Sequence, residues 1–139
     1  MCIRVLIADD QRRARRSLQA LLTALRWTDG SPDTTFSAST NGQLDLVGEA
    51  ADGQQMIAQV EALHPDVVVM ELHLPKLDSV TVIRSIKHRW PTVRIVVLTM
   101  YATDRAAVLA AGADAFLLKG CPTRELLEAV IPHPRADSA

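Results

Sequence analysis

The chain has 139 residues, of which 48% are hydrophobic and 22% charged, and its net charge is -1 at pH 7. This length and composition fit one domain whose hydrophobic core needs no disulfide or metal for stability. The small net charge excludes a strong long-range attraction to nucleic acid or to an anionic membrane, and no apolar run approaches the roughly 20 residues that cross a bilayer. Cys2 and Cys121 form no C-x-x-C pair, so we expect a reducing, cytoplasmic environment.

The first 26 residues predict a buried strand and then an amphipathic helix. Residues 3–8 form an apolar run that ends at the pair Asp9 and Asp10. From Arg12 to about Arg26, apolar residues recur every three or four positions, which is typical of a helix with one buried face. Its first turns hold four arginines, which we expect to be solvated unless they are drawn to the nearby acids or to a partner: Arg12, Arg13, Arg15 and Arg16.

Residues 27–43 have no hydrophobic periodicity and are rich in Ser, Thr, Asp and Gly, which predicts an irregular loop. Loops longer than about 12–15 residues are uncommon in compact domains. Because the segment links a helix to a strand, we expect it at the sheet edge opposite the carboxylates. We interpret it as a mobile insertion, and Trp27 and Phe36 keep a binding loop open as the alternative.

The rest of the chain alternates between strands and helices. Four short apolar runs predict strands: 44–50, 67–70, 93–98 and 113–118. Four helices are predicted from spacing and punctuation: one that starts at Asp52-Gly53 and is closed by His64-Pro65, one capped by Asp78 or Ser79 and stopped by Pro91, one over about 103–111, and one from Pro122.

Five strands that alternate with five helices predict right-handed crossovers and a parallel sheet covered on both faces. The predicted fold class is therefore a doubly wound α/β domain over residues 1–131, with 27–43 as an insertion. Residues 132–139 are polar and broken by proline, which indicates a tail or a linker stub.

Polar side chains follow four of the five predicted strands: Asp9, Asp10, Glu71, Thr99 and Lys119. The carboxyl ends of parallel strands form one edge, and this edge is where open α/β sheets bind ligands. Carboxylates are ligands that Mg²⁺ accepts, and a hydroxyl with an ammonium suits phosphoryl oxygens. The set predicts a site for phosphoryl transfer or phosphoryl sensing. Asp9 and Asp10 could alternatively cap the first helix, but two adjacent acids exceed what a cap requires.

The motifs V-L-I-A-D-D, P-D-V-V-V-M-E-L-H-L-P-K-L-D, V-V-L-T and G-A-D-A-F-L-L-K-G follow one another at successive strand ends. In their order and placement, residues 3 to about 131 resemble a response-regulator receiver (CheY-like) domain of the NarL/FixJ-like branch. The resemblance implies a flavodoxin-like strand order of 2-1-3-4-5. It also implies roles for individual residues: Asp9, Asp10, Glu71 and the main-chain carbonyl of His73 around Mg²⁺, Thr99 and Lys119 on the phosphoryl group, and Phe116 as the aromatic that moves with Thr99.

Glu71 departs from this family's pattern, because the family's phosphoacceptor is an aspartate. The extra methylene moves the carboxylate by roughly 1.5 Å, and about 1 Å of misplacement can cost of order a hundredfold in rate. We therefore expect phosphorylation to be lost or very slow. Glu71 is at best a partial mimic of phosphoaspartate, since it carries less charge and fewer oxygens. An alternative outcome is a direct ion pair between Glu71 and Lys119 that fixes one conformation without metal.

Two further departures are milder. Ser79 stands where the family usually has glycine, and Gly120 replaces a common proline after the lysine. The Lys119-Gly120 peptide is freer than a Lys-Pro peptide, and we expect a more mobile loop there.

The expected function is that of a non-enzymatic receiver module in two-component-type signalling. It would regulate transcription through protein contacts or through an attached or partner DNA-binding domain, without direct nucleic-acid or membrane binding by this segment. Expected partners are a histidine kinase or another regulator, and a second copy of the chain. Two alternatives remain: a receiver that still accepts phosphate from a histidine kinase, and a small Mg²⁺-dependent phosphohydrolase, which would usually show a D-x-D pair that is lacking here.

Overall fold

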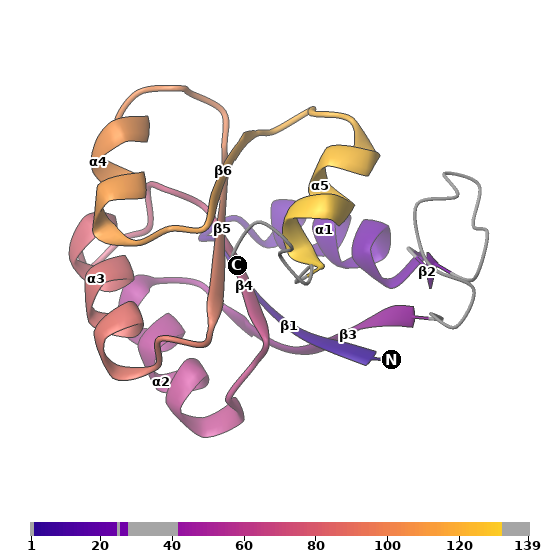
Figure 1. Ribbon diagram of the computed structural model, residues 1–139, viewed down its shortest axis with the longest axis horizontal. Helices are drawn as coiled ribbons and strands as arrows, with labels where there is room; N and C mark the ends of the chain where they lie inside the picture. Colours follow the sequence, from indigo (N-terminus) through magenta and orange to yellow (C-terminus); the bar gives the residue numbers. More distant parts are fainter. Residues whose placement is uncertain (1, 25, 28–41, 132–139) are drawn as a thin grey trace, which may run out of the picture.

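The computed structural model describes residues 2–24, 26–27 and 42–131. In chain order its elements are β1 (Cys2–Ala8), α1 (Arg12–Ala24), β2 (Arg26–Trp27), β3 (Gly42–Ala50), α2 (Gly53–Leu63), β4 (Val67–Met70), α3 (Ser79–Arg89), β5 (Arg94–Thr99), α4 (Arg105–Ala111), β6 (Ala115–Leu118) and α5 (Thr123–Val130). The strands form one sheet in the order β2-β3-β1-β4-β5-β6 (Figure 1).

The five longer strands are all parallel, and their order is the predicted 2-1-3-4-5. Strand β1 lies between β3 and β4, so the first apolar run of the chain becomes a central strand. This order brings the carboxyl ends of β1 and β4 side by side, since Ala8 is paired with Met70. The predicted doubly wound α/β fold is therefore confirmed.

The segment after α1 differs from its prediction. The helix ends at Ala24 rather than near Arg26, and Arg26 and Trp27 form a sixth, antiparallel strand against Gln43 and Gly42. A strand of two residues has no periodicity to detect, which explains why the sequence did not reveal it. The remainder of the predicted insertion, with Phe36, and the predicted tail 132–139 lie outside the described residues.

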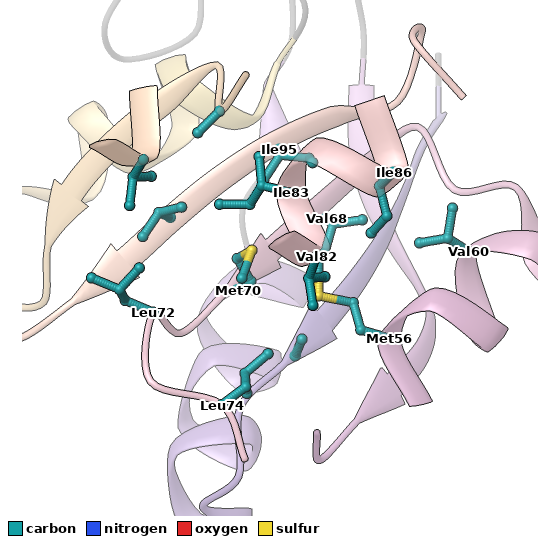
Figure 2. Close-up of a cluster of buried hydrophobic side chains, with 14 of the residues drawn as sticks. Met56, Val60, Val68, Met70, Leu72, Leu74, Val82, Ile83, Ile86 and Ile95 are labelled. Carbon is teal, nitrogen blue, oxygen red and sulfur yellow. The ribbon is translucent and has the colours of Figure 1, made fainter. Parts of the chain in front are cut away.

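The sheet is covered on both faces by two separate hydrophobic clusters. Strand β4 is fully buried and shows the division best, because its side chains alternate between the faces. Val68 and Met70 join the cluster under α2, α3 and α4 (Figure 2). Val67 and Val69 join the cluster under α1 and α5. A strand buried on both faces needs the unbroken apolar run seen before Glu71.

Two aspartates begin helices as the sequence predicts. Asp52 is the N-cap of α2 and accepts a hydrogen bond from the Gln55 amide at 2.8 Å. Asp78 is the N-cap of α3 and accepts from the Thr81 amide at 3.2 Å. These caps fix where both helices start, just beyond the carboxyl edge of the sheet. Across the described ranges, no helix combines the length and the apolar character needed to cross a membrane.

Candidate functional site

The predicted polar residues meet at the carboxyl edge of the sheet. Asp9 follows β1 and Glu71 follows β4, and the Glu71 amide donates to the Ala8 carbonyl at 2.8 Å. Thr99 ends β5, and its carbonyl accepts a hydrogen bond from the Lys119 amide at 2.7 Å. Main-chain hydrogen bonds that continue the sheet therefore place four strand ends next to each other.

Lys119 forms two ion pairs at this edge. Its Nζ lies 2.7 Å from Glu71 Oε1 and 3.1 Å from Asp9 Oδ2. The direct Glu71–Lys119 pair that the sequence left as an alternative is thus present. Asp10, which the sequence could not distinguish from Asp9, is exposed, whereas Asp9 is buried.

The remaining carboxylate oxygens accept hydrogen bonds from the main chain. Glu71 Oε2 accepts from the Leu72 amide at 2.7 Å and, more weakly, from the His73 amide at 3.4 Å. Asp9 Oδ1 accepts from the Gln11 amide at 2.9 Å. Every carboxylate oxygen of Asp9 and Glu71 therefore has at least one donor, and these charged hydrogen bonds hold both side chains in place.

The ion pairs shift the titration of both partners. Burial acts to raise the pKa of Glu71, but Lys119, the nearby Thr99 hydroxyl and the Leu72 amide outweigh it, so the pKa is lowered. Burial acts to lower the pKa of Lys119, but its bonds to Glu71 and Asp9 outweigh this effect, so the pKa is raised. Both groups therefore remain charged at neutral pH.

A cleft of about 560 Å³ lies over this cluster, and its wall is formed by Asp9, Asp10, Gln11, Glu71, His73, Thr99, Met100, Tyr101 and Lys119. Thr99 is fully buried, and among the described residues its Oγ1 has no hydrogen-bond partner of normal geometry, although it lies close enough to Glu71 to help lower that pKa. Buried hydroxyls are normally satisfied. Thr99 Oγ1 is thus a buried polar group at the wall of the cleft that has no hydrogen bond of normal geometry among the described residues.

The acids as arranged do not fit a divalent cation. Within ranges 2–24, 26–27 and 42–131, no three His, Cys, Asp or Glu residues are grouped as metal ligands. The Lys119 ammonium already pairs with Asp9 and Glu71, and a hard cation would need those same oxygens. The metal roles expected for Asp9, Asp10, Glu71 and His73 therefore require a rearrangement around Lys119.

Phe116 lies in β6 and is buried in the cluster that packs under α3 and α4. The guanidinium of Arg105, on α4, lies 5.8 Å from the centre of its ring, within the range of a cation–π contact. The expected movement of Phe116 with Thr99 stays a prediction.

Two residues support the site in ways that the sequence did not specify. Arg15 donates to the main-chain carbonyl of Asp9 at 2.6 Å and pairs with the Glu49 carboxylate at 3.0 Å, so this one of the four arginines is held by an acid of β3. The buried Ser79 hydroxyl donates to the Leu72 carbonyl. The sequence held one signal for this bond: Ser79 stands where the family usually has glycine, which has no hydroxyl to donate. Both bonds restrain loops on which Asp9 and Glu71 stand.

Comparison with known proteins agrees with this geometry. The model of the response regulator receiver domain family matches residues 38–131. The response regulator protein VraR of Staphylococcus aureus is 29% identical over 140 residues, covering 99% of this chain and 59% of VraR. The chain therefore spans about three fifths of the length of that relative.

Two solved structures resemble the fold. The receiver domain of the response regulator NarL from Mycobacterium tuberculosis superimposes with a TM-score of 0.73 and 25% identity, over 92% of both chains. The isolated receiver domain of RcsB from Salmonella enterica, solved with the phosphomimetic BeF₃⁻, gives a TM-score of 0.73 and 25% identity over 92% of this chain and 85% of RcsB.

Proposed function

The chain belongs to the response regulator receiver domain family, and on that premise we propose that it is a signalling module whose output is independent of aspartyl phosphorylation or only weakly tuned by it. The module acts through protein contacts and carries out no catalysis of its own. Glu71 stands at the acceptor position and is held in a fixed charge cluster.

One observation carries this proposal: Lys119 Nζ is shared between Glu71 Oε1 at 2.7 Å and Asp9 Oδ2 at 3.1 Å. Attack on a phosphodonor needs a free carboxylate oxygen in line with the phosphorus, and small displacements are costly. Glu71 is displaced by its extra methylene, one of its oxygens is paired with Lys119, and the other is bonded to the Leu72 amide. The ion pair thus supports a loss of acceptor chemistry.

Mg²⁺ binding is weak or absent in this state of the site. A cation would need Asp9 and Glu71 to exchange an ammonium for a metal, at the cost of two short ion pairs. The buried hydroxyl of Thr99 and the exposed carboxylate of Asp10 remain as other parts of a phosphoryl site. We therefore expect Glu71→Asp to be enough to return an acceptor to the pocket.

The partners are another regulator or a histidine kinase that recognises the fold, and a second copy of the chain. One solved structure of RcsB is described as bound to the promoter rprA in the presence of BeF₃⁻. By analogy, this chain affects transcription through a DNA-binding domain that is attached to it or belongs to a partner, and this segment does not itself bind DNA.

Intact mass spectrometry after incubation with Mg²⁺ and acetyl phosphate tests the proposal. We compare the natural protein with Glu71→Asp, which restores the family's acceptor and has a side chain one methylene shorter. Glu49→Asp is the matched control, because Glu49 is also paired with a basic side chain, Arg15, at the same edge. We expect a phosphoryl adduct on Glu71→Asp alone.

The other outcomes are also informative. A phosphoryl adduct on the natural protein contradicts the proposal and favours a receiver that still accepts phosphate, with peptide mapping to identify the acceptor. A lack of adduct on both proteins contradicts the claim that residue 71 alone silences the pocket.

A further inference from the structure

A second cavity is lined by residues of α1 and α5, two helices that pack on the same face of the sheet. Its volume is about 230 Å³. Most of its lining is apolar: Ala14, Leu18 and Leu21 from α1, Leu126 from α5, and Val69 and Leu98 from the sheet. It thus differs from the cleft over the ion-pair cluster in chemistry and in most of its lining.

The two cavities share one polar wall. Asp9, Glu71 and Lys119 line both of them. These three side chains leave one negative charge in excess, and Arg15, which donates to the Asp9 carbonyl, is already paired with Glu49. Carboxylate oxygens can accept more than one hydrogen bond each. The inner end of an otherwise apolar cavity is therefore a partly buried ion-pair cluster that has one negative charge in excess, and each of its carboxylate oxygens already accepts at least one hydrogen bond.

Size and charge together define what fits. An apolar cavity of about 150 Å³ is known to hold benzene, so this one has room for a ring with a short chain. Ligand pockets of this kind combine apolar walls with a few convergent polar groups. An excess negative charge in a partly buried wall favours a cation over an anion.

From this geometry we infer that the α1–α5 cavity is a binding site for a small hydrophobic amine. Its ring or aliphatic body packs against Leu18 and Leu126, and its ammonium donates to the carboxylates of Asp9 and Glu71. The site does not rest on the proposed loss of phosphorylation, because the cavity and its charge exist whichever residue accepts phosphate.

Methyl NMR with phenethylamine as the probe tests the site. We expect saturable shifts of the Leu18 and Leu126 methyl signals in the natural protein. Ala14→Leu places extra methyl groups inside the cavity, and we expect it to weaken binding at least tenfold. Ala20→Leu is the matched control, since Ala20 lies on the same helix, is exposed and is not part of the lining.

The anion 3-phenylpropanoate, which has a similar body, tests the charge. We expect it to bind at least tenfold more weakly than phenethylamine. Equal or tighter binding of the anion would overturn the inferred ligand class. Equal binding of phenethylamine to the Ala14→Leu and Ala20→Leu proteins would overturn the site itself, as would a lack of saturable shifts in the natural protein.

Discussion

Lys119 Nζ lies 2.7 Å from Glu71 Oε1, although the two residues follow strands that are not neighbours in the sheet. Strand β5 runs between β4 and β6, so the pair spans the end of β5, where Thr99 is fully buried. The Glu71–Lys119 pair thus ties the carboxyl ends of β4 and β6 together across the end of β5.

Glu71→Gln should destabilise the protein by about 1–3 kcal/mol, since a charged hydrogen bond in a partly buried setting is lost while the shape is kept. Urea unfolding followed by circular dichroism measures the change. Glu61→Gln is the control, because the Glu61–Arg89 pair is long, at 3.5 Å, and exposed, and its loss should change stability by no more than about 0.5 kcal/mol. Equal effects of the two substitutions would show that the Glu71 pair is an ordinary surface pair.

The Glu71 contribution to stability should depend on pH with a defined sign. The folded-state pKa of Glu71 lies below its usual value of 4.5. Its contribution is therefore complete above about pH 4.5 and is lost as the pH falls through the folded-state pKa. The difference in unfolding free energy between the natural protein and Glu71→Gln should be constant near neutrality and shrink in acid. A difference that grows in acid would contradict the lowered pKa.

The contribution of Lys119 to stability should also depend on pH, and it should be lost under alkaline conditions. Its pKa is raised above the usual 10.5, so its contribution is present below pH 10.5 and is lost as the pH rises through the folded-state pKa. The comparison of the natural protein with Lys119→Met, by urea unfolding from pH 8 upward, should show a difference that disappears at high pH. A constant difference would mean that Lys119 acts through packing and not through its charge.

Much of the fold follows from local sequence signals. Unbroken apolar runs before Asp9, Glu71 and Thr99 fix the buried parallel strands, because only strands covered on both faces tolerate such runs. Asp52 and Asp78 mark helix starts through their side-chain acceptors. The strand order came from family resemblance, since periodicity does not say which strands are neighbours.

The parts that the sequence could not predict depend on contacts between distant residues. Whether Lys119 pairs with Asp9 or with Asp10 depends on which side chain points into the domain, and the backbone settles this only after folding. The bond from Ser79 to the Leu72 carbonyl and the pairing of Arg26 with Gln43 are also set by tertiary structure. The expected greater mobility at Gly120 stays a prediction.

Gly120 has a φ of 93°, and a Cβ there would meet no atom within 4 Å. Substitution therefore costs backbone strain and not packing. We expect Gly120→Ala to destabilise by about 1–2 kcal/mol, and Gly120→Pro by more, because proline requires a φ near -65° and would displace the adjacent Lys119. Gly120→Asn should cost less than Gly120→Ala, since asparagine tolerates positive φ better. The reverse order in thermal unfolding would contradict this conformation.

The measurement that tests the ion pair most directly is the titration of the Glu71 side-chain carboxyl, followed by ¹³C NMR in the natural protein and in Lys119→Met. Arg89→Met serves as the control, because Arg89 belongs to the exposed pair with Glu61. We predict a Glu71 pKa below 4.5 in the natural protein and in the control. In Lys119→Met the pKa should rise, because burial is no longer offset by the ammonium. A natural Glu71 pKa at or above 4.5, or one that Lys119→Met leaves unchanged, would contradict the account of a site held by this pair.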